Sequence, residues 1–158
     1  SILKEAGVAK MTLYKHFQTK EDLVLAVLRR QDEVFRNQLF TMAKKNGDNP
    51  KDQIIGLFLS LRKLIDKKFN GCLFQKASME YKDDNQAIHR FSREHKMLIK
   101  EFVEERLREL DLVDEKLVSK IMILYNGSLA ESQMSTCAEP LSLTMEIVIQ
   151  LIETEVDK

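Results

Sequence analysis

Five side chains near the start of the chain have the chemistry that nucleic acids bind. Lys10, Lys15 and His16 are basic, and Thr12 and Tyr14 carry hydroxyl groups. Cations and hydroxyls bind phosphate oxygens, and lysine or threonine at the front of a helix also reaches base edges in the major groove. These side chains follow one another closely in the sequence. The pattern therefore predicts a surface that contacts an anionic partner such as DNA.

Charge is distributed unevenly along this chain of 158 residues, although its formal net charge is zero. Residues 1–20 hold four lysines and one glutamate, so positive charge collects at this end and the remainder is net acidic. A basic end on a neutral body indicates an anionic partner at that end. A chance cluster of lysines is the alternative interpretation.

The segment "ILKEAGVAKMTLYKHF" has the pattern of a helix, a tight turn and a second short helix. Gly7 suits the turn because glycine adopts a positive φ without steric cost. We expect Val8 and Leu13 to hold the second helix against the first, and Phe17 to pack rather than to contact DNA. This is the geometry of a helix-turn-helix, whose second helix enters the major groove. Many helical hairpins share this spacing, so the spacing alone does not establish DNA binding.

The stretch "AGVAKMTLYKHFQTKEDL" resembles the signature of the TetR family of transcriptional regulators, and "GCLFQKASMEY" resembles a segment common in that family. The resemblance covers the turn, the recognition helix and the start of the next helix. It implies base contacts from the front of the recognition helix, and phosphate contacts from its later residues and from the start of the following helix. The DNA-binding residues that it implies are Lys10, Met11, Thr12, Tyr14, Lys15, His16 and Lys20.

Two positions depart from the family pattern. Ala9 stands where Ser or Thr is frequent, so we do not expect a phosphate contact from that position. Met11 stands where a small residue, often glycine, is common, and its apolar side chain is expected to alter base preference. The chain begins at Ser1 inside a helical pattern. We therefore expect that the helix that precedes this unit in the family is missing from the chain.

Composition and periodicity predict an all-α protein. Hydrophobic residues make up 44% and charged residues 32% of the chain, with five glycines and two prolines, as is typical of amphipathic helices with charged outer faces. Thr19 and Asp22 predict a capping box at the start of a long helix, and Asn49 with Pro50 predicts the start of the next. Seven or eight helices are expected, including 19–45, one from Pro50, 72–81, 87–110, 114–135 and 140–156.

The predicted helices are expected to form two parts with different roles. Residues 1–22 are predicted to form a partial helix-turn-helix DNA-binding domain without its first helix. Residues 23–158 are predicted to form a helical bundle that binds an effector and dimerises. The predicted fold class is thus all-α, with a helix-turn-helix head followed by a bundle.

The last two predicted helices, about 114–135 and 140–156, are unusually apolar. The final helix is apolar on almost every side, so it must be covered on more than one side. The same patch on a second copy is the simplest cover, which predicts a homodimer with two-fold symmetry through these helices. Burial within the core of a single chain is the alternative.

The resemblance also implies a small-molecule effector that binds among the later helices. Ligand pockets are mostly apolar with few polar groups, so large inward side chains are the candidates, with His95 as a polar contact. Ordinary core packing is the alternative for each of them. The candidates are Phe58, Leu61, Phe74, Met79, Phe91, His95, Met122 and Tyr125.

These features predict a DNA-binding transcriptional regulator, expected to be a repressor, that binds a palindromic operator as a homodimer and is released by a small-molecule effector. A helical ligand-binding or scaffold protein without DNA binding is the alternative.

No enzyme motif, metal-ligand spacing or cofactor motif stands out in the sequence, so no catalytic activity, metal or cofactor is expected. The two cysteines are far apart, which is typical of a reduced cytoplasmic protein. No apolar run is long enough to predict a membrane span.

Overall fold

The computed structural model describes residues 5, 7, 10–65 and 69–157, without the side chain of Leu64. These residues form seven helices and no strand, which confirms the predicted all-α class. The helices are α2 (Lys10–His16), α3 (Lys20–Lys45), α4 (Pro50–Ile65), α5 (Leu73–Glu80), α6 (Ala87–Arg108), α7 (Glu115–Ser135) and α8 (Glu139–Val156).

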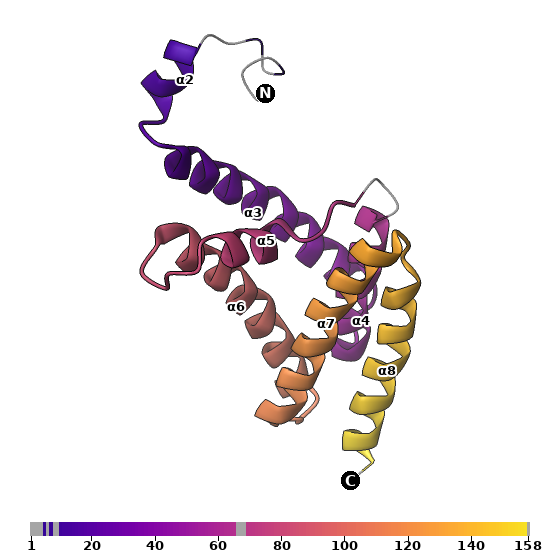
Figure 1. Cartoon of the computed structure of the whole chain (residues 1–158). Coiled ribbons are helices and arrows are strands. Elements are labelled where there is room, and N and C mark those ends of the chain that lie inside the picture. Colours follow the sequence, from indigo (N-terminus) through magenta and orange to yellow (C-terminus); the bar gives the residue numbers. More distant parts are fainter. Residues whose placement is uncertain (1–4, 6, 8–9, 66–68, 158) are drawn as a thin grey trace.

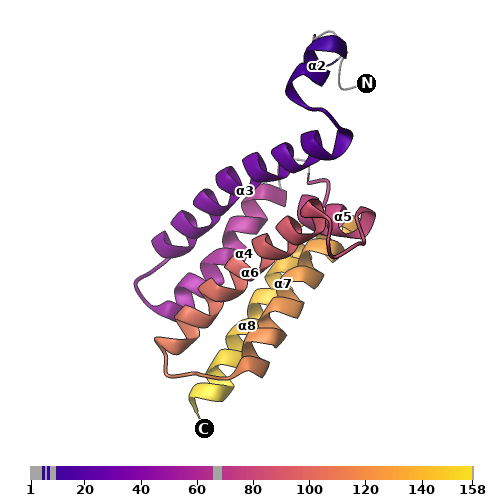
Figure 2. The same cartoon turned by 90° about the vertical axis from the view of Figure 1, so that its left-hand side faces the viewer.

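One long helix connects a small head to a bundle. Helix α2 stands clear of the other helices at the N-terminal end of α3 (Figures 1 and 2). Helix α3 has 26 residues, which corresponds to a length of about 39 Å, and it runs from α2 into the bundle. Helices α4 and α6 pack against α3, and α8 and α7 pack in turn against α4 and α6. The domain boundary predicted at residues 22 and 23 therefore falls within the first turn of α3.

Polar side chains cap the starts of α3 and α4 as the sequence predicts. Thr19 and Asp22 form the predicted capping box: the Thr19 hydroxyl accepts from the Asp22 N–H at 3.1 Å, and the Asp22 carboxylate accepts from the Thr19 N–H at 2.9 Å. At the start of α4, the Asn49 side chain accepts from the Lys51 N–H at 2.8 Å. Helix α8 begins at Glu139, one residue before the predicted start.

Two apolar clusters hold the helices together. The larger one is formed by α3, α4, α6, α7 and α8 and includes the fully buried Phe58, Ile99 and Ile121. The smaller one includes Leu28 and Phe74 and joins α3 to α5 and α6. Because the smaller cluster lies nearer the head, it positions the first half of α3.

Helices α3 and α4 approach closely at Gly56. A Cβ atom at this position would lie 2.7 Å from both the Cα and the carbonyl oxygen of Ala43, so no larger residue fits unless the backbone moves. Glycine at this position therefore sets the separation of the two helices.

Within the described residues, no helix has the length and hydropathy needed to cross a membrane.

Candidate DNA-binding surface and ligand cavity

The short helix α2 exposes a basic surface. Its sequence, KMTLYKH, contains three basic residues and no acidic one, and none of its residues is buried. Leu13 and Phe17 are half-buried, and the Phe17 N–H donates to the Leu13 carbonyl at 2.9 Å. Tyr14 is 55% exposed, and the Lys10 amine lies 5.8 Å from the centre of its ring. An exposed surface with cations and a hydroxyl can contact phosphates and base edges.

The predicted DNA-binding residues share one property in the structure: the side chains of Lys10, Met11, Thr12, Tyr14, Lys15, His16 and Lys20 are all exposed. Gly7, predicted to make the turn, has a φ of 64°, a conformation that favours glycine. Val8 and Ala9, to which the sequence also assigned roles, lie outside the described residues.

Lys20 has a second partner that the sequence did not reveal. Its amine lies 3.1 Å from a carboxylate oxygen of Glu80 at the end of α5, and this carboxylate raises the pKa of Lys20. Both side chains are exposed, and exposed ion pairs contribute little to stability. Lys20 therefore remains charged, and its amine stays accessible to solvent. Sixty residues separate the two in sequence, so no local pattern indicates the pair.

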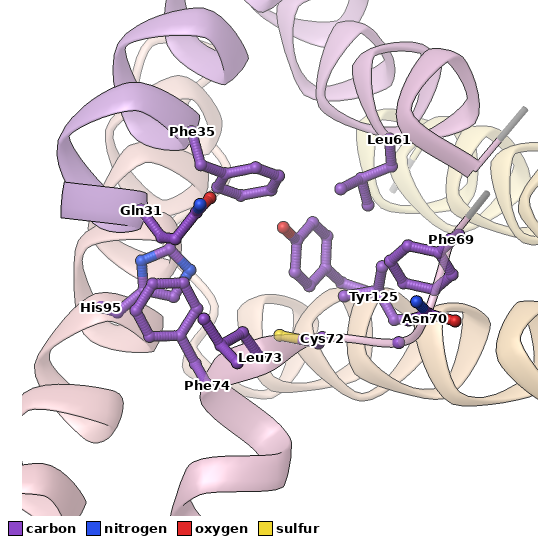
Figure 3. A pocket seen from close by; sticks show the side chains of 12 residues that line it. Gln31, Phe35, Leu61, Phe69, Asn70, Cys72, Leu73, Phe74, His95 and Tyr125 are labelled. Carbon is purple, nitrogen blue, oxygen red and sulfur yellow. The ribbon is translucent and has the colours of Figure 1, made fainter. Parts of the chain in front are cut away.

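A cavity of about 230 Å³ lies in the bundle where α3 to α7 meet (Figure 3). Its walls are mostly apolar, and the Tyr125 ring projects into the space between Phe35, Leu61 and Phe69. The lining residues are Gln31, Phe35, Leu61, Phe69, Asn70, Gly71, Cys72, Leu73, Phe74, His95, Tyr125 and Leu129.

The structure brings four of the eight candidate pocket residues together at this cavity: Leu61, Phe74, His95 and Tyr125. The other four lie elsewhere. Phe58 and Met122 are buried in the larger cluster, and Phe91 packs against the smaller one. Met79 is 72% exposed on α5, so it faces solvent. Helical periodicity identifies the inward side of a helix but not which inward side chain borders a hollow.

Sequence reasoning missed the wall that α3 contributes. Gln31 and Phe35 line the cavity from α3, and residues 69–72 line it from the segment before α5. Phe35 follows the apolar spacing of α3, so its inward position was predictable. The position of Phe35 at a cavity was not predictable, because the opposite walls of the cavity come from helices distant in sequence.

A polar network beside the cavity joins α3 to α6. His95 is buried and stacks on Phe74, with 3.5 Å between the ring centres. Its Nδ1 lies 2.7 Å from the buried Asp32 carboxylate, whose other oxygen accepts from Arg36 at 3.0 and 3.2 Å. Burial lowers the pKa of His95 to about 4, although the hydrogen bond to Asp32 acts in the opposite direction. His95 is therefore neutral near pH 7 and donates its Nδ1 proton to Asp32.

Two buried donors without hydrogen-bond partners lie at or behind the cavity wall. The Tyr125 hydroxyl and the Lys96 amine make no hydrogen bond to any described residue. The Lys96 amine lies 5.0 Å from the centre of the Tyr125 ring. Burial raises the pKa of Tyr125 well above its ordinary value, so the hydroxyl keeps its proton. Burial lowers the pKa of Lys96, and the neighbouring Cys72 partly offsets the lowering.

Among the described residues, no group of three or more histidine, cysteine, aspartate or glutamate side chains has the arrangement of a metal site. The cavity and the α2 surface are therefore the two candidate sites. The first is apolar with a few polar groups, and the second is exposed and basic.

Comparison with known proteins identifies what the chain is similar to. Residues 1–27 match the family described as bacterial regulatory proteins, tetR family. Comparison with curated protein sequences gave no significant match. A TetR-family transcriptional regulator from Streptomyces coelicolor is similar in structure, with a TM-score of 0.79 and 29% identity over 99% of this chain and 81% of that one. NemR of E. coli in its reduced form has the same fold, with a TM-score of 0.75 and 20% identity over 94% and 82% of the two chains.

Proposed function

The chain belongs to the TetR family of DNA-binding transcriptional regulators, and from this premise we propose that it is a homodimeric repressor released from a palindromic operator by a small molecule. The observation that carries the proposal is the exposed basic surface of α2, which contains no acidic residue and no buried one. Regulators of this family are generally not enzymes.

In the proposed complex, α2 lies in the major groove. Lys10, Met11 and Thr12 at its N-terminal end contact base edges, and Tyr14, Lys15 and His16 contact the sugar-phosphate backbone. Lys20 adds a phosphate contact at the start of α3, where the helix dipole also favours an anion. The organisation proposed from the sequence, a head within residues 1–22 and an effector and dimerisation part in residues 23–158, assigns the two roles to different parts of the chain.

The homodimer is proposed to form through α7 and α8. Ile123 and Leu143 are exposed apolar side chains on these helices, 71% and 54% exposed in the single chain. They line a groove between α7 and α8 together with small residues such as Gly127 and Ser128. A two-fold dimer would cover these side chains and present two copies of α2 to half-sites about 34–36 Å apart.

The cavity is proposed as the effector site because it connects directly to α3. A molecule in it would contact Phe35 on α3 and His95 on α6 together. Helix α2 lies directly before α3 in the chain. A ligand that changes the separation of α3 and α6 would therefore move α2 and change the spacing between the two copies of α2 in the dimer. Release from DNA requires only that the ligand bind one spacing more tightly than the other.

A mobility-shift experiment with the full-length protein and the DNA flanking its own gene tests the proposal. We expect a shift at low salt that weakens steeply as salt increases, because phosphate contacts release counterions. Absence of a shift at low salt would contradict the repressor function.

Substitutions on α2 provide the residue-level test. Lys15→Ala should weaken binding to all DNA sequences alike, whereas Thr12→Ala should cost about 1–3 kcal/mol and change the preference between sequences. Lys44→Ala is the matched control, since Lys44 is exposed near the opposite end of α3. Equal losses for Lys15→Ala and Lys44→Ala would show that α2 is not the DNA-binding surface.

A further inference from the structure

The polar groups at the cavity can donate hydrogen bonds that the protein itself does not accept. Tyr125 lines the cavity and is 1% exposed, and its protonated hydroxyl makes no hydrogen bond to the described residues. The Lys96 amine also makes no hydrogen bond of good geometry, and its neighbours are the Tyr125 ring and the Cys72 side chain. Buried donors are nearly always satisfied in folded proteins. This pair therefore indicates a ligand that carries a hydrogen-bond acceptor.

The charges around the cavity favour a negatively charged acceptor. None of the residues found to line the cavity is an aspartate, glutamate, lysine or arginine. The nearby Asp32 carboxylate is already paired with Arg36 and hydrogen-bonded by the neutral His95. The charge of Lys96 has no such carboxylate partner among the described ion pairs. When Lys96 is protonated, the field inside the cavity is therefore positive, and it acts strongly because the surroundings are apolar.

A second cation lies at one wall. The Lys76 amine donates to the carbonyl of Asn70, a lining residue in the segment before α5. Lys76 is exposed, so its effect on the interior is weaker than that of Lys96, but it has the same sign. An anion would thus meet positive charge on its way to the Tyr125 hydroxyl.

Size and shape limit the rest of the ligand. An apolar cavity of roughly 150 Å³ accepts benzene, so a volume of about 230 Å³ accommodates one aromatic ring with a substituent. The walls include the rings of Phe35, Phe69 and Phe74, and aromatic rings pack favourably against one another. A single ring therefore fits both the volume and the lining.

Resting on the proposed role of the cavity as the effector site, we propose that the effector is a one-ring aromatic acid. Its carboxylate accepts a hydrogen bond from the Tyr125 hydroxyl and lies in the positive field of Lys96. Its ring occupies the space between the phenylalanine side chains. Binding of the anion would also stabilise the protonated form of Lys96, whose pKa burial lowers.

Three probes of nearly equal size but different charge test this proposal: benzoate, benzamide and benzylamine. Their binding to the full-length protein is measured by calorimetry, with affinities expected between about 0.1 and 10 mM for such small molecules. Benzoate should bind about ten times more tightly than benzamide, and benzylamine should bind most weakly, because hydrogen bonds to a charged group are the stronger ones. Benzylamine binding as tightly as benzoate, or no binding of any probe, would overturn the proposal.

Variants locate the site. Lys96→Met should remove the preference for benzoate over benzamide, and Tyr125→Phe, which deletes one hydroxyl, should weaken benzoate binding several-fold. Tyr81→Phe is the matched control, because Tyr81 is also a buried tyrosine with an unpartnered hydroxyl in the described structure, but it lies in the smaller cluster and not at the cavity. Unchanged benzoate binding in both Lys96→Met and Tyr125→Phe would contradict the proposed site.

The DNA mobility shift is measured on the same protein preparations. Failure of the proposed ligand class can therefore be distinguished from failure of the proposed regulator function. A protein that shifts DNA but does not prefer benzoate contradicts the ligand class and leaves the regulator function intact. A protein that prefers benzoate but never shifts DNA contradicts the regulator function, while the binding site stands.

Discussion

At the scale of single residues, the most unusual feature is His95, a buried histidine that stays neutral although it lies beside the carboxylate of Asp32. His95 is buried beside Asp32, yet the charge of Asp32 is already balanced by Arg36, 3.0 Å away. Protonation of His95 would place a second cation in this buried network. Burial therefore keeps the pKa of His95 low, at about 4, despite the nearby carboxylate.

This lowered pKa predicts loss of stability on mild acidification. Between about pH 6.5 and pH 4 the unfolded chain binds a proton at His95 and the folded chain does not, so the free energy of unfolding falls as pH falls, by about 3 kcal/mol in total. Urea unfolding followed by circular dichroism at several pH values measures the decrease. His95→Gln, which keeps a donor for Asp32, should lose this part of the pH dependence. Identical pH profiles for both proteins would contradict the assigned pKa.

At the scale of elements, α3 is the connection between the two candidate sites. Its first turn follows α2 directly, and residues 31 and 35 on the same helix line the cavity. Contacts with α5 and α6 through the smaller cluster and the Asp32–His95 hydrogen bond determine where the helix lies. The start of α3 is held by the capping box of Thr19 and Asp22. The orientation of α2 relative to the bundle thus depends on this cap.

Removal of the cap should weaken both the fold and DNA binding. Thr19→Ala is expected to lower the free energy of unfolding by about 1 kcal/mol, because the Asp22 N–H loses its side-chain acceptor. Thr19→Ser retains the hydroxyl and should restore both stability and DNA affinity. Thr154→Ala on α8 is the control, since that hydroxyl bonds only within its own helix, to the Gln150 carbonyl. Denaturant unfolding and the mobility shift measure the two effects.

At the scale of the whole molecule, the surface of α7 and α8 requires explanation. These two helices lie side by side at one side of the bundle (Figures 1 and 2). Exposed apolar side chains on both helices border a shallow groove lined also by Gly127 and Ser128. Small residues allow close approach of a second helix pair, and an apolar surface favours association. This surface is the basis of the proposed homodimer.

Charge placed on this surface should separate the dimer without unfolding the chain. Leu143→Glu puts a carboxylate on a side chain that is half exposed in the single chain, so the monomer tolerates it, whereas a dimer would have to bury the charge. Analytical ultracentrifugation should show a dimer for the unmodified protein and a monomer for the variant. Val113→Glu, between α6 and α7 and 81% exposed, is the control. A dimer in Leu143→Glu would place the interface elsewhere.

Local patterns predicted the elements well, because each depends on neighbouring residues. The capping box at Thr19 and the start of α4 at Pro50 were predicted to the residue, since side-chain caps act within three or four positions. The exposed basic side of α2 was equally predictable, because the spacing of Leu13 and Phe17 determines which residues face away. These features require no knowledge of the rest of the fold.

The cavity and its polar groups depend on contacts between distant parts of the chain. Phe58 and Tyr125 are both large, inward and buried, yet only Tyr125 lines the hollow, because that depends on how α3, α4, α6 and α7 pack together. The pairing of Asp32 with His95 spans 63 positions and that of Lys20 with Glu80 spans 60. The sequence by itself determined the helices and the exposed basic residues of α2, and it carried the resemblance to the TetR family, since these follow from short-range periodicity and local motifs. The tertiary structure alone decided which inward side chains enclose a space and which buried donors lack a partner, because packing, not pattern, places them.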